Sequence, residues 1–248
     1  MSNFLYSAGE LACRAFLCQK VAKTVGSWYD DQGKGAFTVA EQETVRLYSR
    51  QNEKTLAQLE RDGRIINSRT YVRLHFGDMA EHYLESYDWF TEEASRRVPR
   101  PADVQASIWC SISVENCLRP IPGTVVYVLE VPRDKVIYFD EEKWDYVLNR
   151  VYIPKDEADR AAYREHLRAM GIQSGFEILQ GRWRGQYPQE EQRIRESWKR
   201  VFEIDNWTIF NVCGNIWEIR KEWIRRIVRP GEDLLALEKG AAGQTPQP

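Results

Sequence analysis

The sequence predicts an α+β protein in which several helices flank a mixed or antiparallel sheet. Runs rich in β-branched residues alternate along the chain with stretches of helical spacing. A length of 248 residues suits one hydrophobic core, and 9 Trp, 12 Tyr and 9 Phe can fill a large one. We therefore expect a helical extension over residues 1–43, a single α+β domain over 44–230 and a disordered tail over 231–248.

The first elements follow from apolar spacing and from capping residues. Glu10–Val25 has helical spacing, whereas Thr44–Ser49 alternates as a strand does. A short helix should follow, with Asn52 as its N-terminal cap and Gly63 in a left-handed conformation at its end. Ile65 and Ile66 then start a short extended segment.

The next stretch should contain a short strand and a long helix. Tyr71–Leu74 alternates, which predicts extended structure. Asp78–Arg97 carries apolar residues at steps of three and four, and this spacing predicts a helix with one aromatic face in the core. The members of this stripe are Met79, Tyr83, Tyr87 and Phe90.

The most pronounced strand patterns lie in the middle of the sequence. Ser107–Val114, Val125–Val131 and Val136–Phe139 are rich in β-branched residues, and Gly123 provides a turn. The simplest arrangement is an antiparallel meander.

Helices and loops dominate the second half until the last strands. Helices are expected over 156–169 and 189–202, separated by an exposed, glycine-containing loop over 171–188. Trp207–Val212 is predicted to be a strand, Gly214 and Asn215 a bulge or tight turn, and Ile216–Ile219 its continuation.

Composition excludes several classes of protein. No apolar run is long enough for a bilayer span, and the first residues lack the pattern of a secretory signal. Five cysteines without a CxxC pair suit reduced thiols, so we expect a cytoplasmic location. With three histidines and no ligand-type spacing, we expect no metal site.

Charge and sequence motifs exclude further classes of function. The net charge of −2 gives no global field that attracts nucleic acid, although residues 182–229 carry eleven bases against seven acids. Walker, GxGxxG, GxSxG and HExxH motifs are missing from the sequence. A cysteine nucleophile has no local support either, so inert buried thiols are the expectation.

The order of rare aromatic residues resembles an uncharacterised bacterial family, number thirty-eight forty-one in the series of domains of unknown function. The resemblance spans roughly residues 45–228 and supplies no activity. It rests on Tyr87 to Phe90, Ile108, Trp109, Glu130, Val131, Val136 to Asp140, Trp144, Val147 to Asn149, Ser197, Trp198, Val201, Phe202, Trp217 and Glu218.

A second resemblance suggests a chemistry. Leu47 and Tyr48, followed by a helix and Asp62-Gly63, are similar to the opening of DarT-like ADP-ribosyltransferases, and the stretch from Phe210 to Val228 is similar to their last strand pair. That family implies a split sheet that grips NAD and a late glutamate that stabilises the oxocarbenium-like sugar as nicotinamide leaves.

Carried onto this sequence, the second resemblance implies specific roles. Tyr48, Ser49 and Arg50 would bind the dinucleotide, Tyr127 would stack on it, and Glu218 would be the catalytic carboxylate. The simplest alignment places Asn215 at the glutamate position, so Glu218 needs a shift of strand register to face the cleft.

Two functions therefore stay open. The first is an ADP-ribosyltransferase-like protein that binds NAD or another nucleotide and acts in conflict between bacteria and phages. The second is a non-enzymatic module of the same fold that binds nucleic acid or a protein partner. In the second, Arg182, Trp183 and Arg184 would stack on and neutralise a nucleic-acid strand.

Overall fold

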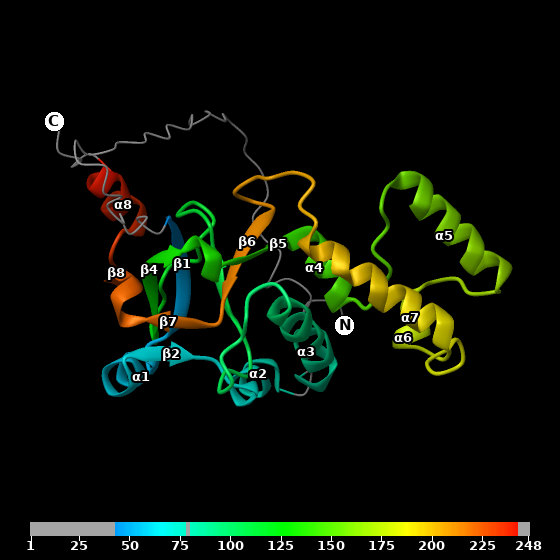
Figure 1. Ribbon diagram of the computed structural model, residues 1–248, viewed down its shortest axis with the longest axis horizontal. Coiled ribbons are helices and arrows are strands. Elements are labelled where there is room, and N and C mark those ends of the chain that lie inside the picture. The colour runs from blue at the N-terminus through cyan, green and yellow to red at the C-terminus, as the bar shows by residue number, and fades with distance from the viewer. Residues whose placement is uncertain (1–42, 78–79, 243–248) are drawn as a thin grey trace, which may run out of the picture. The chain divides into compact units, whose positions relative to one another are not determined.

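A computed structural model describes residues 43–77 and 80–242, which form the α+β architecture expected from the sequence (Figure 1). The predicted helix Glu10–Val25 and the rest of the extension up to residue 42 lie outside the described residues. The helices are α1 (Thr55–Asp62), α2 (Arg69–Phe76), α3 (Ala80–Ser95), α4 (Glu141–Leu148), α5 (Glu157–Ala169), α6 (Phe176–Leu179), α7 (Pro188–Ser197) and α8 (Leu234–Ala242). The strands are β1 (Thr44–Asn52), β2 (Arg64–Ile66), β3 (Ile108–Ser111), β4 (Thr124–Pro132), β5 (Ile137–Asp140), β6 (Val212–Ile216), β7 (Glu218–Arg220) and β8 (Ile224–Val228).

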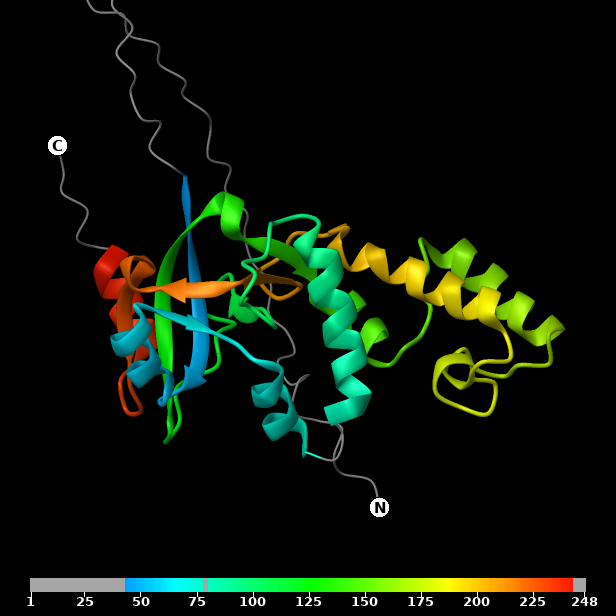
Figure 2. The same cartoon turned by 60° about the horizontal axis from the view of Figure 1, so that its bottom comes forward.

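The strands form two antiparallel sheets. Six strands pair in the order β5-β6-β3-β1-β4-β8, and β2 pairs with β7 in a separate ribbon. The longest pairing joins β1 to β4 over nine residues of each, from Thr44 opposite Pro132 to Asn52 opposite Thr124. In Figure 2 these two strands run side by side. The alternation that predicted β1 and the β-branched run that predicted β4 thus both correspond to strands.

The predicted meander is wrong, because β1 lies between β3 and β4. The chain leaves β3 and returns through residues 112–123 to pair on the other edge of β1. Gly123, with φ of 82°, makes the turn into β4 as expected. Sequence neighbours therefore do not pair here, since the nine-residue match with β1 replaces the local hairpin.

The capping prediction for α1 is confirmed in part. Gly63 takes a left-handed φ of 69° and its N–H binds the carbonyl of Leu59. Asn52 lies two residues before the N-cap, where its Oδ1 accepts from the N–H of Lys54. Tyr71–Leu74, predicted to be extended, lies within helix α2, because a four-residue alternation is too short to exclude helical spacing.

Tyr87 and Phe90 of the predicted aromatic face of α3 pack into the main core, whereas Met79 lies outside the described residues. Phe90 is fully buried, with ring centroids 5.3 Å from Phe139 and 5.2 Å from Trp144. Tyr87 meets Trp109 and Trp144 edge-on at 5.7 and 5.3 Å. These contacts hold α3 and α4 against one face of the sheet, at the β3, β5 and β6 end.

Two loops differ from the predictions. Residues 171–188 contain α6, and Ile172, Ile178 and Leu179 are buried in the main core, so the segment is not a wholly exposed loop. The predicted strand at 207–212 is irregular at 207 and 208 and a turn at 209–211, and Gly214 and Asn215 lie inside a regular β6. Position 214 favours glycine, because a Cβ would lie 3.1 Å from Cδ2 of Leu47, which would have to shift by a few tenths of an ångström.

The C-terminal segment also differs from the predicted tail, since residues 234–242 form helix α8. Leu234 is fully buried in a small cluster with Tyr48, Val126, Val128 and Val228. This burial gives the helix the apolar anchor that composition alone did not suggest. Among the described residues, no helix combines the length and apolar character that crossing a bilayer requires.

Candidate functional site

The predicted catalytic carboxylate is buried, and its ion-pair partners are partly exposed. Glu218 is at the start of β7, opposite Ile66, and is 4 % exposed. Its Oε2 accepts from Nη1 of Arg64 at 2.8 Å and its Oε1 from Nε of Arg220 at 2.6 Å. Arg64 also pairs with Asp103. Both oxygens of Glu218 are therefore occupied by neighbouring guanidinium groups.

Two of the predicted NAD-binding residues lie on one face of β1, where Tyr48 contacts α8 and Arg50 contacts the loop before β4. The hydroxyl of Tyr48 donates to Oε2 of Glu238 at 2.9 Å. Burial, followed by the hydrogen bond to Glu238 and then the Glu238 charge, raises the pKa of Tyr48, which keeps the phenol protonated. Arg50, two residues along the same face of β1, donates to the carbonyl of Arg119 at 3.2 Å.

The other two lie on the opposite face of the sheet. Ser49 is paired in register with Tyr127, whose ring is fully buried beside Leu47. Ser49 donates to the carbonyl of Trp109 at 2.8 Å, and the Tyr127 hydroxyl lies 2.9 Å from Oγ1 of Thr55. The structure therefore does not bring the predicted NAD-site residues into one cleft.

The predicted nucleic-acid cluster lies between α6 and α7. Arg182 covers the ring of Trp183 at 4.6 Å, and that ring is half-buried against the main core and meets Tyr187 edge-on. Arg184 is 4.0 Å from the carboxylate of Glu85. The three predicted residues lie together, but the indole face that was expected to stack on a base is taken by Arg182.

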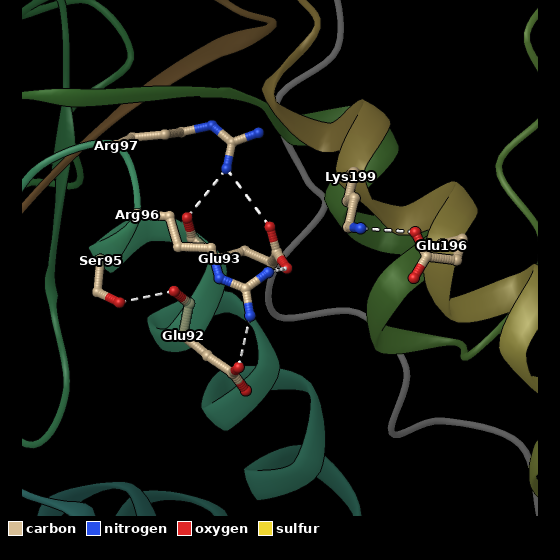
Figure 3. Close-up of polar contacts among 7 residues, drawn as sticks. All are labelled: Glu92, Glu93, Ser95, Arg96, Arg97, Glu196 and Lys199. Atoms are coloured by element: carbon tan, nitrogen blue, oxygen red, sulfur yellow. Dashed lines mark hydrogen bonds and ion pairs between the residues drawn. The ribbon is translucent and has the colours of Figure 1, made fainter.

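A further charged cluster closes the end of α3 (Figure 3). Glu93, almost fully buried, accepts from Arg96 at 2.5 Å and lies 3.6 Å from Arg97. Lys199 pairs with Glu196 at 2.6 Å on the neighbouring segment. Each charged residue that Figure 3 labels pairs with an opposite charge three or four residues away in its own segment, so these pairs stabilise the end of α3 and the end of α7 separately.

A pocket of about 320 Å³ beside α5 has a different character. Its wall includes Arg160, Arg164 and Arg168, which are four residues apart and so lie on one face of the helix. No carboxylate lines it. The helix begins at the N-cap Asp156, whose side chain accepts from the N–H of Asp159 at 2.8 Å.

One residue that lines the pocket carries a buried hydroxyl without a hydrogen-bond partner in the described part of the chain. Tyr163 is 6 % exposed, and among the described residues its Oη has no hydrogen-bond partner. Its ring stacks on Tyr152 with centroids 4.1 Å apart, and the guanidinium of Arg193 lies 5.0 Å from its centroid. Burial, and after it the charge of Glu190, raises the pKa of Tyr163, so the hydroxyl remains a donor.

The pocket arginines have weakly held partners. Glu157 lies 3.0 Å from Arg160 and 3.4 Å from Arg164, and Glu165 lies 3.2 Å from Arg168. Both glutamates are more than 70 % exposed, and ion pairs of this kind contribute about 0–1 kcal/mol. The guanidinium groups can therefore turn to an anionic ligand with little loss.

A second helix supports α5. Figure 1 and Figure 2 both show α7 beside it, and Nε2 of His166 lies 2.8 Å from Oε1 of Glu190 between the two. The predicted helix over 156–169 corresponds to α5, and the four-residue spacing of its arginines is the feature of the sequence that could have indicated this site. Among the described residues, no group of three or more His, Cys, Asp or Glu is arranged to hold a metal ion.

Residues 46–225 match the family described as Domain of unknown function (DUF3841). The chain belongs to this family. The match confirms the first resemblance, and its extent is close to the predicted 45–228. All residues that line the α5 pocket fall within it. No curated protein and no solved structure matches the chain, so the DarT-like resemblance stays a prediction.

Proposed function

We propose that this DUF3841 protein is a non-enzymatic binding module that holds nucleic acid at the α5 pocket. The observation that carries the proposal is the row of Arg160, Arg164 and Arg168 on a pocket wall without a carboxylate. One guanidinium group can donate two parallel hydrogen bonds to two oxygens of a phosphate. Residues four apart on a helix are separated by about 6 Å along its axis. Successive phosphates of one strand can therefore meet successive arginines.

The geometry gives less support to NAD-dependent transfer. That reaction needs Arg50, Tyr127 and Glu218 to converge on one cleft, whereas Arg50 and Tyr127 lie on opposite faces of the main sheet and Glu218 lies in a separate ribbon. Binding of NAD or another nucleotide, without transfer, remains compatible with the α5 pocket, because NAD also carries phosphates. The transfer step itself stays a prediction from resemblance.

Salt-titrated fluorescence anisotropy with a labelled oligonucleotide tests the proposal. The logarithm of the binding constant should fall with that of salt concentration by about 0.7 for each phosphate contacted, or about 2 for three contacts. Replacing Arg160, Arg164 and Arg168 by Gln should flatten this slope and weaken binding.

A matched variant changes three exposed arginines outside the pocket, Arg61, Arg225 and Arg229, to Gln. It loses the same charge and should keep more of the slope than the pocket variant. Equal effects of the two triple variants would overturn the proposal, as would the absence of oligonucleotide binding at low salt.

A further inference from the structure

The Tyr163 hydroxyl makes the α5 pocket more than a patch of positive charge. Buried tyrosine hydroxyls usually find a partner, because leaving a buried donor unpaired is unfavourable. Tyr163 is 6 % exposed, lines the pocket and has no partner for its Oη among the described residues. A ligand that accepts a hydrogen bond at this point would satisfy it.

The dimensions of the pocket limit what that ligand is. About 320 Å³ lies at the lower end of the 300–1,000 Å³ of small-molecule sites. A duplex is far too wide to enter, and its bases are stacked inside it, so a base reaches a pocket only when it is unpaired. Tyr146 adds an aromatic wall, and its hydroxyl accepts from Arg160 at 3.2 Å.

We infer that the pocket takes one unpaired nucleotide of a single strand, with its phosphate against the arginine row and a polar atom of its base or sugar accepting from the Tyr163 hydroxyl. This inference rests on the proposed function and deepens it, because it names single-stranded nucleic acid as the ligand. It also assigns Tyr163 as a specificity-determining residue.

Gly175 provides a second way to probe the same contact. A Cβ at this position would lie 3.7 Å from Oη of Tyr163 and 3.6 Å from Cδ1 of Leu167, which are ordinary van der Waals distances. Its φ of −59° suits alanine. Gly175→Ala should therefore fold, while its methyl group narrows the space in front of the hydroxyl.

The test compares wild type, Tyr163→Phe, Gly175→Ala and the control Tyr187→Phe, which lies outside the pocket. Each is titrated with labelled single strands of about ten nucleotides, as DNA and as RNA, and with the corresponding duplexes. Wild type should bind single strands at least about tenfold more tightly than duplex, and Tyr163→Phe should weaken that binding about fivefold to tenfold. Tyr163→Phe should leave the melting temperature unchanged, because no protein hydrogen bond is lost.

The outcomes distinguish failure of the proposed function, nucleic-acid binding, from failure of the single-nucleotide pocket. If neither single strand nor duplex binds, the proposed function itself fails. If both bind equally, or if Tyr163→Phe and Gly175→Ala bind single strands as wild type does, nucleic-acid binding stands and the single-nucleotide pocket is wrong. A difference between the DNA and RNA arms shows which strand supplies the nucleotide, since only RNA carries the 2′-hydroxyl.

Discussion

Glu218 and Arg64 form an ion pair across the β2–β7 ribbon, with Oε2 of the carboxylate 2.8 Å from Nη1 of the guanidinium. Replacing Glu218 by Gln removes the charge that two arginines share. Because Arg64 and Arg220 remain partly exposed, we expect a loss of about 1–3 kcal/mol in the free energy of unfolding. Chemical denaturation measures it.

Glu222→Gln is the control for this variant, since Glu222 is 64 % exposed and its ion pair with Arg220 is long, at 3.8 Å. Its unfolding midpoint should stay close to that of wild type. A Glu218→Gln protein with unchanged stability that has lost an NAD turnover seen in wild type would restore the predicted catalytic role.

The anchoring of α8 gives a second prediction. Leu234 is fully buried, so Leu234→Ala should lower the free energy of unfolding by about 2–4 kcal/mol. Leu235 is only half-buried, and Leu235→Ala should have a clearly smaller effect. Thermal unfolding followed by circular dichroism compares them, and equal losses would mean that α8 does not dock through Leu234.

Local pattern was sufficient for much of the fold but not for strand order. The alternation of β1, the β-branched run of β4, the glycine end of α1 and the aromatic face of α3 each depend on nearby residues in the sequence, and each is predicted from them. The insertion of β1 between β3 and β4 depends on contacts about eighty residues apart, such as Leu47 opposite Leu129. Periodicity within a segment contains no information about such a partner.

The candidate site as a whole could not be predicted from the sequence, because it too depends on contacts between segments. Arginines at 160, 164 and 168 are visible in the printed sequence, but their meaning depends on what faces them. The missing partner of Tyr163, and its closeness to Gly175, follow only from the packing of α5 on the segment after it. By contrast, Tyr48, Ser49 and Arg50 looked like one motif, although alternation along a strand sends their side chains to opposite faces.

The buried thiols should react slowly. Burial raises the pKa of Cys110 to about 12 and that of Cys117 to about 11, so almost no thiolate forms at pH 8. Alkylation with iodoacetamide, followed by peptide mass mapping, should leave both unmodified in the folded protein and modify both in urea. Rapid labelling of Cys110 in the native state would contradict its burial.

The buried thiols should also lower the stability of the fold at high pH. A folded-state pKa above the unfolded value means that their contribution to stability is complete below about pH 9 and is lost as pH rises towards 12. Cys110→Ala should therefore reduce the fall in stability between pH 9 and 11. An unchanged fall would place its cause at other groups.

Glu85 gives a prediction at the acid end of the pH range. On α3, it lies 3.1 Å from Nη2 of Arg150 and also pairs with Arg195. Burial alone would raise its pKa, but the hydrogen bond from Arg195 and the charge of Arg150 lower it below the ordinary 4.5. Its contribution is therefore present above about pH 4.5 and is lost as pH falls through the folded-state value. Glu85→Gln should lower the free energy of unfolding by about 1–3 kcal/mol at pH 7, since Arg150 is almost fully buried.

The difference between wild type and Glu85→Gln should shrink as pH falls below 4.5, because protonation removes the same charge from the wild-type side chain. Urea denaturation at pH 7, 5, 4 and 3 follows this convergence. Glu81→Gln is the matched control on the same helix, because Glu81 is 77 % exposed and its pair with Arg73 is open to water. Its stability should follow that of wild type at every pH. A gap for Glu85→Gln that stays constant down to pH 3 would show that packing, and not the charge of the carboxylate, is what the substitution disturbs.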